Sequence, residues 1–511
     1  MKPKQPIHLV GDLGARENGG LLSPALSPIR NGGEGKAAGR SGTLKATCLL
    51  VGFLAAGSAA AETGSAGLLN DWLPEQVPGA TPFDLGGQVR FRFESKDYMA
   101  VAGTPGAVDF RAASSDPHNS YFLLREKIHL GYTASPWLRV FVEGRDSSST
   151  GDDRNPNPDS DSLDLHQAFV SLGDPAQFPV TLKVGRQELS YGDERLIGPS
   201  DWLNIPRTFD ALKARFENEQ FWVDAFTSRP VLANDDRFNV SNDYEYFSGI
   251  YGSTKALVPK NETQLYFLAR NVEKQSPAAT TGSPQAGGAS PRDIYTVGAR
   301  VKSLPGSMAG WDYQAEAAGQ FGRFKFAPAA KSLSQQAYAL SVLAGYTWEN
   351  TASHPRLGLE YNFASGDSNP ADGRHGTFDN LYPTNHRLYG FMDFVSWQNI
   401  NDLRLTASCK PVTGVTLTAD LHGFWLADTR DFFYDVKGAA RTTGGYGINP
   451  AANNYLGSEL DLTASYAFRN WGVAQAGYGH FFAENFIQQS LSVTGGRHDA
   501  DWLYLQMTLN F

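Results

Sequence analysis

Basic side chains recur at every second position in several stretches of the sequence. Arg90 and Arg92 stand two residues apart, and so do Arg125 and Lys127. A period of two places residues on one face of a β-strand. Guanidinium groups pair with carboxylates through a planar fork, so a face that carries several of them favours the binding of anions. The pattern therefore indicates a strand-built surface whose chemistry is anion binding.

The residues that could support catalysis or metal binding form no recognisable pattern. His166, His422 and His480 could serve a hydrolase, but their spacing assembles no triad with a serine and a carboxylate. Phosphate-binding Gly-Lys loops, His-Glu-x-x-His helices and paired cysteines are absent, and the two cysteines, Cys48 and Cys409, are far apart. We expect no enzyme, no cofactor, no metal and no nucleic-acid partner.

Strands must position these residues, because the sequence from Asp84 onward alternates apolar and polar residues in stretches of about ten. Val89, Phe91 and Phe93, for example, alternate with charged residues. Short turns alternate with long polar connections along the chain, and we expect no helix among these strands and loops. Alternating short turns and long loops are typical of an outer-membrane barrel.

The fold class that follows is all-β: a transmembrane antiparallel up-and-down β-barrel of about 18 strands, with short periplasmic turns and long extracellular loops. The segment 387–397 could pass for a strand, but counting it breaks the even strand number. We assign it to a long loop, 365–400, folded into the lumen. The strands are expected near 84–95, 121–133, 138–146, 161–172, 179–189, 207–216, 220–229, 243–253, 261–271, 291–302, 310–323, 334–347, 355–364, 401–409, 414–427, 456–468, 471–483 and 500–511.

Both ends of the chain carry targeting features. Residues 49–61 form an apolar run that ends in small residues, so we interpret residues 1–61 as an N-terminal extension and signal peptide. Residues 1–40 lie unusually far upstream of this apolar run and suggest that the start codon was mispredicted. Residues 62–83 would form a short periplasmic segment and 84–511 the barrel. The last strand ends in Phe511 after apolar residues at every second position, like the signal read by the barrel-assembly machinery.

Charged side chains must face the lumen, because one at the bilayer midplane facing lipid costs about 2–4 kcal/mol. Acidic residues such as Glu94, Glu143, Asp224, Glu316 and Glu360 point the same way but are fewer than the bases. With a formal net charge of -9, much acidity must lie in the loops, so the lumen is expected to be cationic. The alternative is that these bases pair with lumenal acids. The expected pore-lining bases are Arg90, Arg92, Arg125, Lys127, Arg139, Arg145, Lys183, Lys213, Arg215, Arg270, Arg300, Arg356 and Arg404.

One segment is distinctive: GRQELSYGDERLIG at 185–198, followed by DWLN at 201–204 and RTFD at 207–210. It resembles the alginate export family, and the similarity extends from about Phe83 to Phe511. The resemblance implies an eighteen-stranded barrel with an electropositive constriction through which an anionic polysaccharide leaves the periplasm. The charged motif residues at the top of the strand and in its loop would either brace that loop by salt bridges or contact substrate. They are Arg186, which falls on the apolar parity of its strand and so belongs at the rim, Glu188, Asp193, Glu194 and Arg195.

These observations leave three hypotheses. The first is an outer-membrane channel that passes a uronate polymer by passive, electrostatically guided diffusion. The second is a general or small-anion porin in which a folded loop narrows the pore. The third is a barrel enzyme or an adhesin that uses its long loops. The partners expected for the first are the polymer or another anionic solute, outer-membrane lipid and periplasmic export partners.

Overall fold

The computed structural model describes most of the chain from Gly67 onward. The predicted signal peptide, residues 1–61, lies outside the described residues, and so does the beginning of the predicted periplasmic segment. The described residues are 67–511 without 78, 102–106, 112–115, 236, 275, 277–289, 328, 493 and 495.

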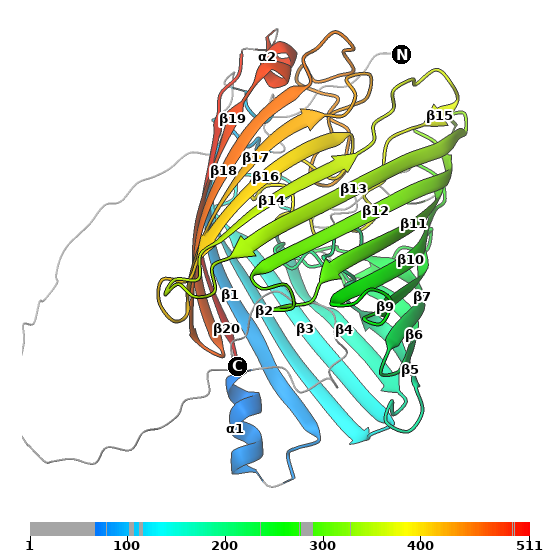
Figure 1. Ribbon diagram of the computed structural model, residues 1–511, viewed down its shortest axis with the longest axis vertical. Coiled ribbons are helices and arrows are strands. Elements are labelled where there is room, and N and C mark those ends of the chain that lie inside the picture. The colour runs from blue at the N-terminus through cyan, green and yellow to red at the C-terminus, as the bar shows by residue number, and fades with distance from the viewer. Residues whose placement is uncertain are drawn as a thin grey trace, which may run out of the picture. The chain divides into compact units, whose positions relative to one another are not determined.

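The described residues form an antiparallel wall of long strands, each paired with the next along the chain (Figure 1). The two-residue strands β8 (Val240–Ser241) and β15 (Arg374–His375) belong to loops. β8 pairs with the last residues of β7, and β15 pairs parallel to the extracellular end of β13. The long strands are β1 (Phe83–Asp97), β2 (His118–Ser135), β3 (Leu138–Thr150), β4 (Asp161–Leu172), β5 (Val180–Gln187), β6 (Phe209–Glu217), β7 (Phe221–Leu232), β9 (Glu245–Thr254), β10 (Asn261–Val272), β11 (Arg292–Ser303), β12 (Trp311–Phe324), β13 (Leu333–Thr347), β14 (Arg356–Ala364), β16 (Ile400–Cys409), β17 (Val415–Leu426), β18 (Tyr455–Arg469), β19 (Gly472–Ala483) and β20 (Ala500–Asn510).

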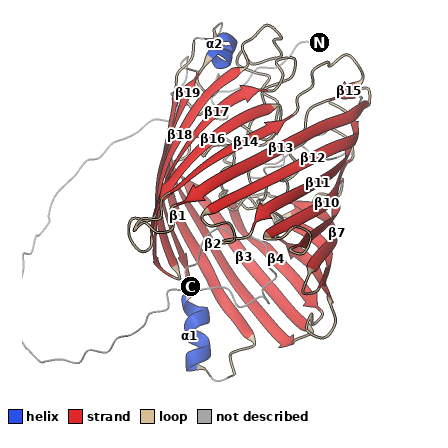
Figure 2. Ribbon diagram, viewed as in Figure 1, coloured by secondary structure: helices blue, strands red, loops and turns tan. Residues whose placement is uncertain are grey.

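The last strand closes the barrel onto the first. β1 pairs antiparallel with β20 from Gln88 opposite Asn510 to Asp97 opposite Asp501. Closure leaves few backbone N–H and C=O groups unpaired. This is required in hydrocarbon, because no water is present there to bond them. The prediction of an antiparallel barrel of eighteen strands is confirmed, and Figure 2 shows that strands dominate the described chain.

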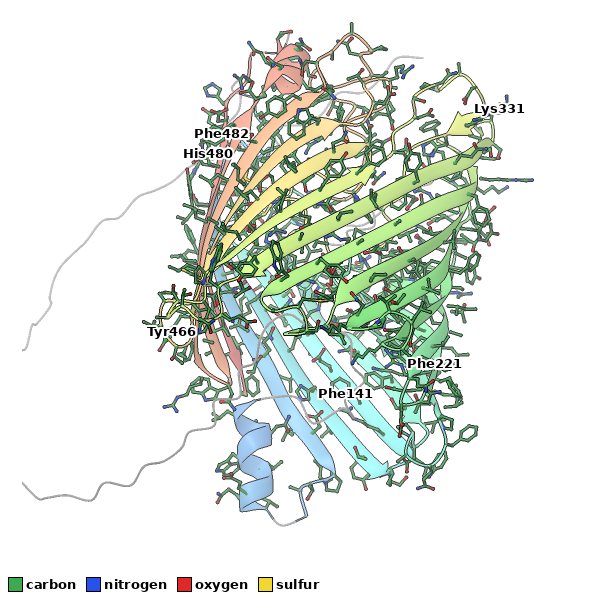
Figure 3. All side chains as sticks on the ribbon, viewed as in Figure 1. Phe141, Phe221, Lys331, Tyr466, His480 and Phe482 are labelled. Atoms are coloured by element: carbon green, nitrogen blue, oxygen red, sulfur yellow. The ribbon has the colours of Figure 1, made fainter. Side chains whose placement is uncertain are left out.

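The two faces of the wall differ as the alternation predicts. On β10, Leu265 and Phe267 are exposed on the outside, whereas Gln264 and Arg270 are buried inside. Figure 3 shows His480 and Phe482 at the outer edge of the wall, on the upper part of β19. The apolar face is therefore the one that meets lipid.

Two short helices were not predicted. Helix α1 (Leu68–Gln76) lies beside the part of β1 that extends past the end of β20. The Asn70 side chain accepts a hydrogen bond from the Leu85 backbone N–H at 2.9 Å, so α1 covers an open strand edge. Helix α2 (Asn485–Leu491) lies in the last long loop and buries Phe486, among others. No helix within the described residues is long and apolar enough to cross a membrane.

Two loops fill much of the barrel interior. The β5–β6 loop (188–208) and the β14–β16 loop (365–399) contribute Ile197, Tyr382 and Trp397, each at most 1% exposed, to a buried apolar cluster. Both loops also bond to inward-facing strand side chains, so they lie in the lumen. Residues 387–397 form no strand and belong to this second loop, as predicted.

Candidate functional site

The structure places the thirteen predicted pore-lining bases on the inner face of the wall. Seven are buried: Arg90, Arg92, Arg125, Lys127, Arg145, Arg270 and Arg300. The other six are partly exposed to the lumen: Arg139, Lys183, Lys213, Arg215, Arg356 and Arg404. Phe141 shares the inner face of β3 with Arg139 and Arg145, and Figure 3 shows it within the barrel.

Most of these bases have a carboxylate partner. Arg92 pairs with Glu94 at 2.8 Å, and Arg215 pairs with Asp224 at 2.6 Å. Lys183 lies over the Phe169 ring, 3.6 Å from its centroid. The alternative in which lumenal acids compensate the bases therefore describes much of this wall. Further pairs are Arg125 with Asp201, Lys127 with Asp201 and Glu188, Arg139 with Asp84, Arg145 with Asp161, Lys213 with Asp224, Arg215 with Glu217, Arg270 with Glu245 and Asp379, Arg300 with Asp193, Arg356 with Asp312, and Arg404 with Asp420 and Glu360.

The tip of the β5–β6 loop inserts among bases of β1 and β2. Arg90 donates to the backbone carbonyls of Asp201 and Leu203 at 2.7 and 3.0 Å. Arg125 donates to the Asp201 carbonyl at 2.9 Å and to its carboxylate at 3.1 Å, and Lys127 lies 3.4 Å from that carboxylate. Three cations thus converge on one residue of the loop.

The Asp201 side chain remains 55% exposed in this cluster. Enclosure by the barrel raises the pKa of Asp201, but the charges of Arg125, Lys127 and Arg90 outweigh it and hold that pKa well below its ordinary range. Asp201 is therefore an anion held by cations while open to the lumen.

The neighbouring Trp202 ties this tip to the β14–β16 loop. The Arg92 guanidinium lies 3.8 Å from the Trp202 ring centroid, and the His386 ring stacks on it at 4.0 Å. Arg92 also donates to the Trp202 carbonyl at 2.7 Å. Such stacking fixes the loop tip against the wall.

The charged motif residues all bond within the protein. Arg186 pairs with Asp210 at 2.9 Å, so it bridges two neighbouring strands near the loop end of β5. Burial raises the pKa of Glu188, but Lys127 and a 2.8 Å hydrogen bond with His166 bring it below the ordinary value. The other motif contacts are Asp193 with Arg300, Glu194 with Ser190, and Arg195 with Glu360.

The two lumenal loops pair with each other. Ile197 bridges Tyr382 in parallel, and the Tyr382 backbone accepts from the Gly198 N–H and donates to the Leu196 carbonyl, both at 2.9 Å. Arg207 donates to the carbonyls of Gly198, Tyr382 and Pro383. Burial lowers the pKa of Arg207 to about 9.

The wall also holds the β14–β16 loop at separate points. Asp379 pairs with Arg270 at 3.0 Å and with Arg292 at 2.7 Å. Burial raises the pKa of Asp379, but the two arginines outweigh it and lower that pKa. The Met392 N–H donates to Glu459 at 2.8 Å on the opposite side. This loop therefore lies across the lumen.

Sequence reasoning missed the residues that complete this site: Asp201, Trp202, Arg207, Asp379 and Arg387. The first three lie in the quoted motif segments, so their presence was visible although their contacts were not. Arg387 is exposed and donates only a long bond to the Asp193 carbonyl, and no carboxylate within the described residues pairs with it. Loop residues have no period that could have revealed them.

The three candidate catalytic histidines are each bonded to a carboxylate. His166 bonds to Glu188, His422 to Asp402 and His480 to Asp501, each at 2.8 Å. Among the described residues, no cluster of His, Cys, Asp and Glu could hold a metal ion. The chemical property that distinguishes the site is therefore its concentration of charged side chains.

Comparisons with known proteins agree with this geometry. The sequence matches the family described as alginate export over residues 81–501. No curated protein matches it.

Solved outer-membrane barrels of Pseudomonas aeruginosa share the fold. OccD3 (OpdP) is 13% identical, with a TM-score of 0.51 over 85% of this chain and 92% of that one. OpdQ is 12% identical, with a TM-score of 0.52 over 84% of this chain and 97% of that one. OccK2 (OpdF), solved in complex with glucuronate, is 13% identical, with a TM-score of 0.50 over 84% of this chain and 98% of that one.

Proposed function

The chain belongs to the alginate export family and folds as an outer-membrane barrel of the porin type, and on this premise we propose that it is a passive channel for a carboxylate-bearing polysaccharide. The polymer would be of the uronate class, drawn through the lumen by its cations. Neither the family nor the fold calls for a catalytic step.

The observation that carries the proposal is the position of Asp201. Its exposed carboxylate pairs with Arg125 and Lys127, as a uronate carboxylate would, while Arg90 bonds the backbone carbonyl of the same residue. Because it belongs to a loop and is open to the lumen, an incoming carboxylate can compete with it for the same guanidinium and ammonium groups. The protein thus carries its own replaceable counter-ion at the loop tip.

Further partly exposed pairs extend this scheme along the lumen. Lys302 and Asp193 are 3.7 Å apart and 29% and 25% exposed. Arg404, 14% exposed, lies near the exposed Arg387, whose carbonyl it bonds. Passage of a polyanion requires several sites, none of which binds too tightly, and cations that already have protein partners satisfy this condition.

The competing function is a channel for small anions. Two loops paired across the lumen favour it, because they narrow the passage between the walls. The solved neighbour with glucuronate was crystallised with a single sugar acid, which this hypothesis would extend to the present chain.

Conductance in planar bilayers separates the two. A polymer channel should be blocked by oligouronates, increasingly with their length, whereas neutral oligosaccharides of equal length should block far less. Lys127→Gln should weaken the block by several-fold, since it removes one cation from the Asp201 cluster. Equal block by glucuronate and by long oligouronates would favour the small-anion channel, and no block by either would overturn both.

Delivery to the membrane completes the proposal. Residues 1–61 would direct export and be removed, and the strand ending in Phe511 would engage the barrel-assembly machinery. The cations of the lumen would make the open channel anion-selective. A mature N-terminus near Glu62, found by sequencing the purified protein, is the expected result for cleavage.

A further inference from the structure

The outer face of β14 and β16–β20 contains two rows of side chains with the same unusual order. In each row, two adjacent alanines lie between leucines. Across the strands, the first row runs Leu357, Ala407, Ala419 and Leu462. The second, two residues nearer the short turns, runs Leu417, Ala464, Ala476 and Leu505.

These rows line an open hollow of about 690 Å³, here called the alanine trough. Leu357 and Leu505 are 49% and 52% exposed, so the trough is on the outside of the barrel. Its volume lies within the range of about 300–1,000 Å³ typical of pockets that hold small molecules. The alanines form its floor and the leucines its walls.

The trough is closed at one end and open at the other. On the extracellular side, the next outward row consists of leucines on β14 and β16–β18, namely Leu359, Leu405, Leu421 and Leu460, and continues with His480 on β19. On the side of the short turns, Pro355 and Cys409 line the hollow, and the next residue after Cys409, Lys410, is exposed. A cation thus stands next to the open end.

We propose that the alanine trough binds one acyl chain of a glycerophospholipid from the periplasmic leaflet, with the phosphate near Lys410. The trough lies on the membrane-spanning wall, where hydrocarbon is the surrounding medium and an apolar hollow cannot be filled favourably by water. Because the trough is closed toward the extracellular side and has Lys410 beside its open end, we assign the lipid to the periplasmic leaflet. The ligand class is an anionic-headgroup or zwitterionic phospholipid with a long alkyl chain.

A second copy of the chain fits this surface less well. In a two-fold dimer the same patch meets itself, and two hollows facing each other would leave an unfilled space between the wall strands. Such voids forfeit the close packing that stabilises contacts within a membrane. A flexible alkyl chain can follow the trough without this penalty.

The test measures lipid retention by the mature barrel in detergent. The delipidated protein is incubated with palmitoyl-oleoyl phosphatidylglycerol and examined by native mass spectrometry. Ala464→Phe fills the floor of the trough and should weaken retention about tenfold, as expected for the loss of about two buried methylene groups. Lys410→Gln should weaken it by a smaller factor.

Ala315→Phe is the matched control. Ala315 is an exposed alanine on the outer face of β12 between Val301 and Val342, so the same substitution there should leave retention unchanged. Ala407→Phe replaces Ala464→Phe if the latter does not fold, as judged by the heat-dependent mobility of the barrel on a gel. Channel conductance should be unaltered in all variants, which separates this test from that of the proposed function.

Three outcomes would overturn the proposal. The first is equal retention of phosphatidylglycerol by the native chain, Ala464→Phe and Ala315→Phe. The second is retention of lipid A from native membranes in place of a glycerophospholipid. The third is a dimer that Ala464→Phe dissociates.

Discussion

Arg195 and Glu360 form an ion pair inside the barrel, across 165 residues of sequence, and join the β5–β6 loop to strand β14. Both side chains are at most 3% exposed. Arg195 also donates to the Tyr389 hydroxyl at 3.1 Å, so one guanidinium bonds the wall and both lumenal loops. Its many neighbouring anions, Glu360 first among them, outweigh burial and raise the pKa of Arg195.

Replacing Arg195 by Met should destabilise the barrel by about 3 kcal/mol, because a buried carboxylate loses its principal partner. The value lies at the lower end for such losses, since Arg404 remains 3.6 Å from the other Glu360 oxygen. The double variant Arg195→Met with Glu360→Leu should lose less than Arg195→Met alone. Equilibrium unfolding in lipid vesicles measures both, and simple addition of the two single losses would contradict the pairing.

Replacing Asp201 by Asn should increase the preference for anions, because Arg90, Arg125 and Lys127 lose their exposed counter-ion. The expected change is a several-fold rise in anion-over-cation permeability, measured as a reversal potential across a salt gradient. Asp243→Asn is the control, since Asp243 is 71% exposed in an extracellular loop and changes the net charge equally. Equal shifts in both variants would show that the lumenal position is irrelevant.

His375 should make the β14–β16 loop sensitive to acid. Burial and the charge of Arg292 lower the pKa of His375 to about 3, and its ring is stacked on Phe324 and bonded to Gln335 at 2.8 Å. Between pH 6.5 and 3 the unfolded chain binds a proton that the folded one does not, so stability falls as pH falls.

The loss of folding stability due to His375 should reach about 2–3 kcal/mol at pH 4.5 relative to pH 7.5. His375→Gln removes the titrating group while keeping a hydrogen-bonding side chain, so its melting temperature should fall less over the same interval. Other groups titrate in both proteins, and only the difference between them is assigned to His375. Parallel curves would refute the assignment.

A charge on the outer face should be costly at mid-strand only. Val297, near the middle of β11, is 53% exposed on the face that meets lipid. Val297→Arg should destabilise the barrel by about 2–4 kcal/mol, whereas the same change at Val258, in the turn between β9 and β10, should cost about 0–1 kcal/mol. Urea unfolding in vesicles gives both values. Similar costs at the two positions would argue against a lipid boundary there.

The sequence by itself determined the wall. A period of two is a local property, so it decided which side chains lie together on one face, as with Arg90 and Arg92 on the inside and Phe91 on the outside. Lipid tolerates only one of the two faces, which fixed the direction of the charges. The turns fixed the strand count, and the terminal strand supplied the partner that closes the ring on β1.

Only the tertiary structure decided what each inward base meets. Arg300 bonds Asp193 across 107 residues and Arg270 bonds Asp379 across 109, and both carboxylates belong to loops without a period. A loop conformation depends on the wall against which it folds, so neither the pairing of Ile197 with Tyr382 nor the position of Asp201 can be read from spacing. Alternation fixes a side chain's direction, whereas the fold alone brings distant loops to the same point in the lumen.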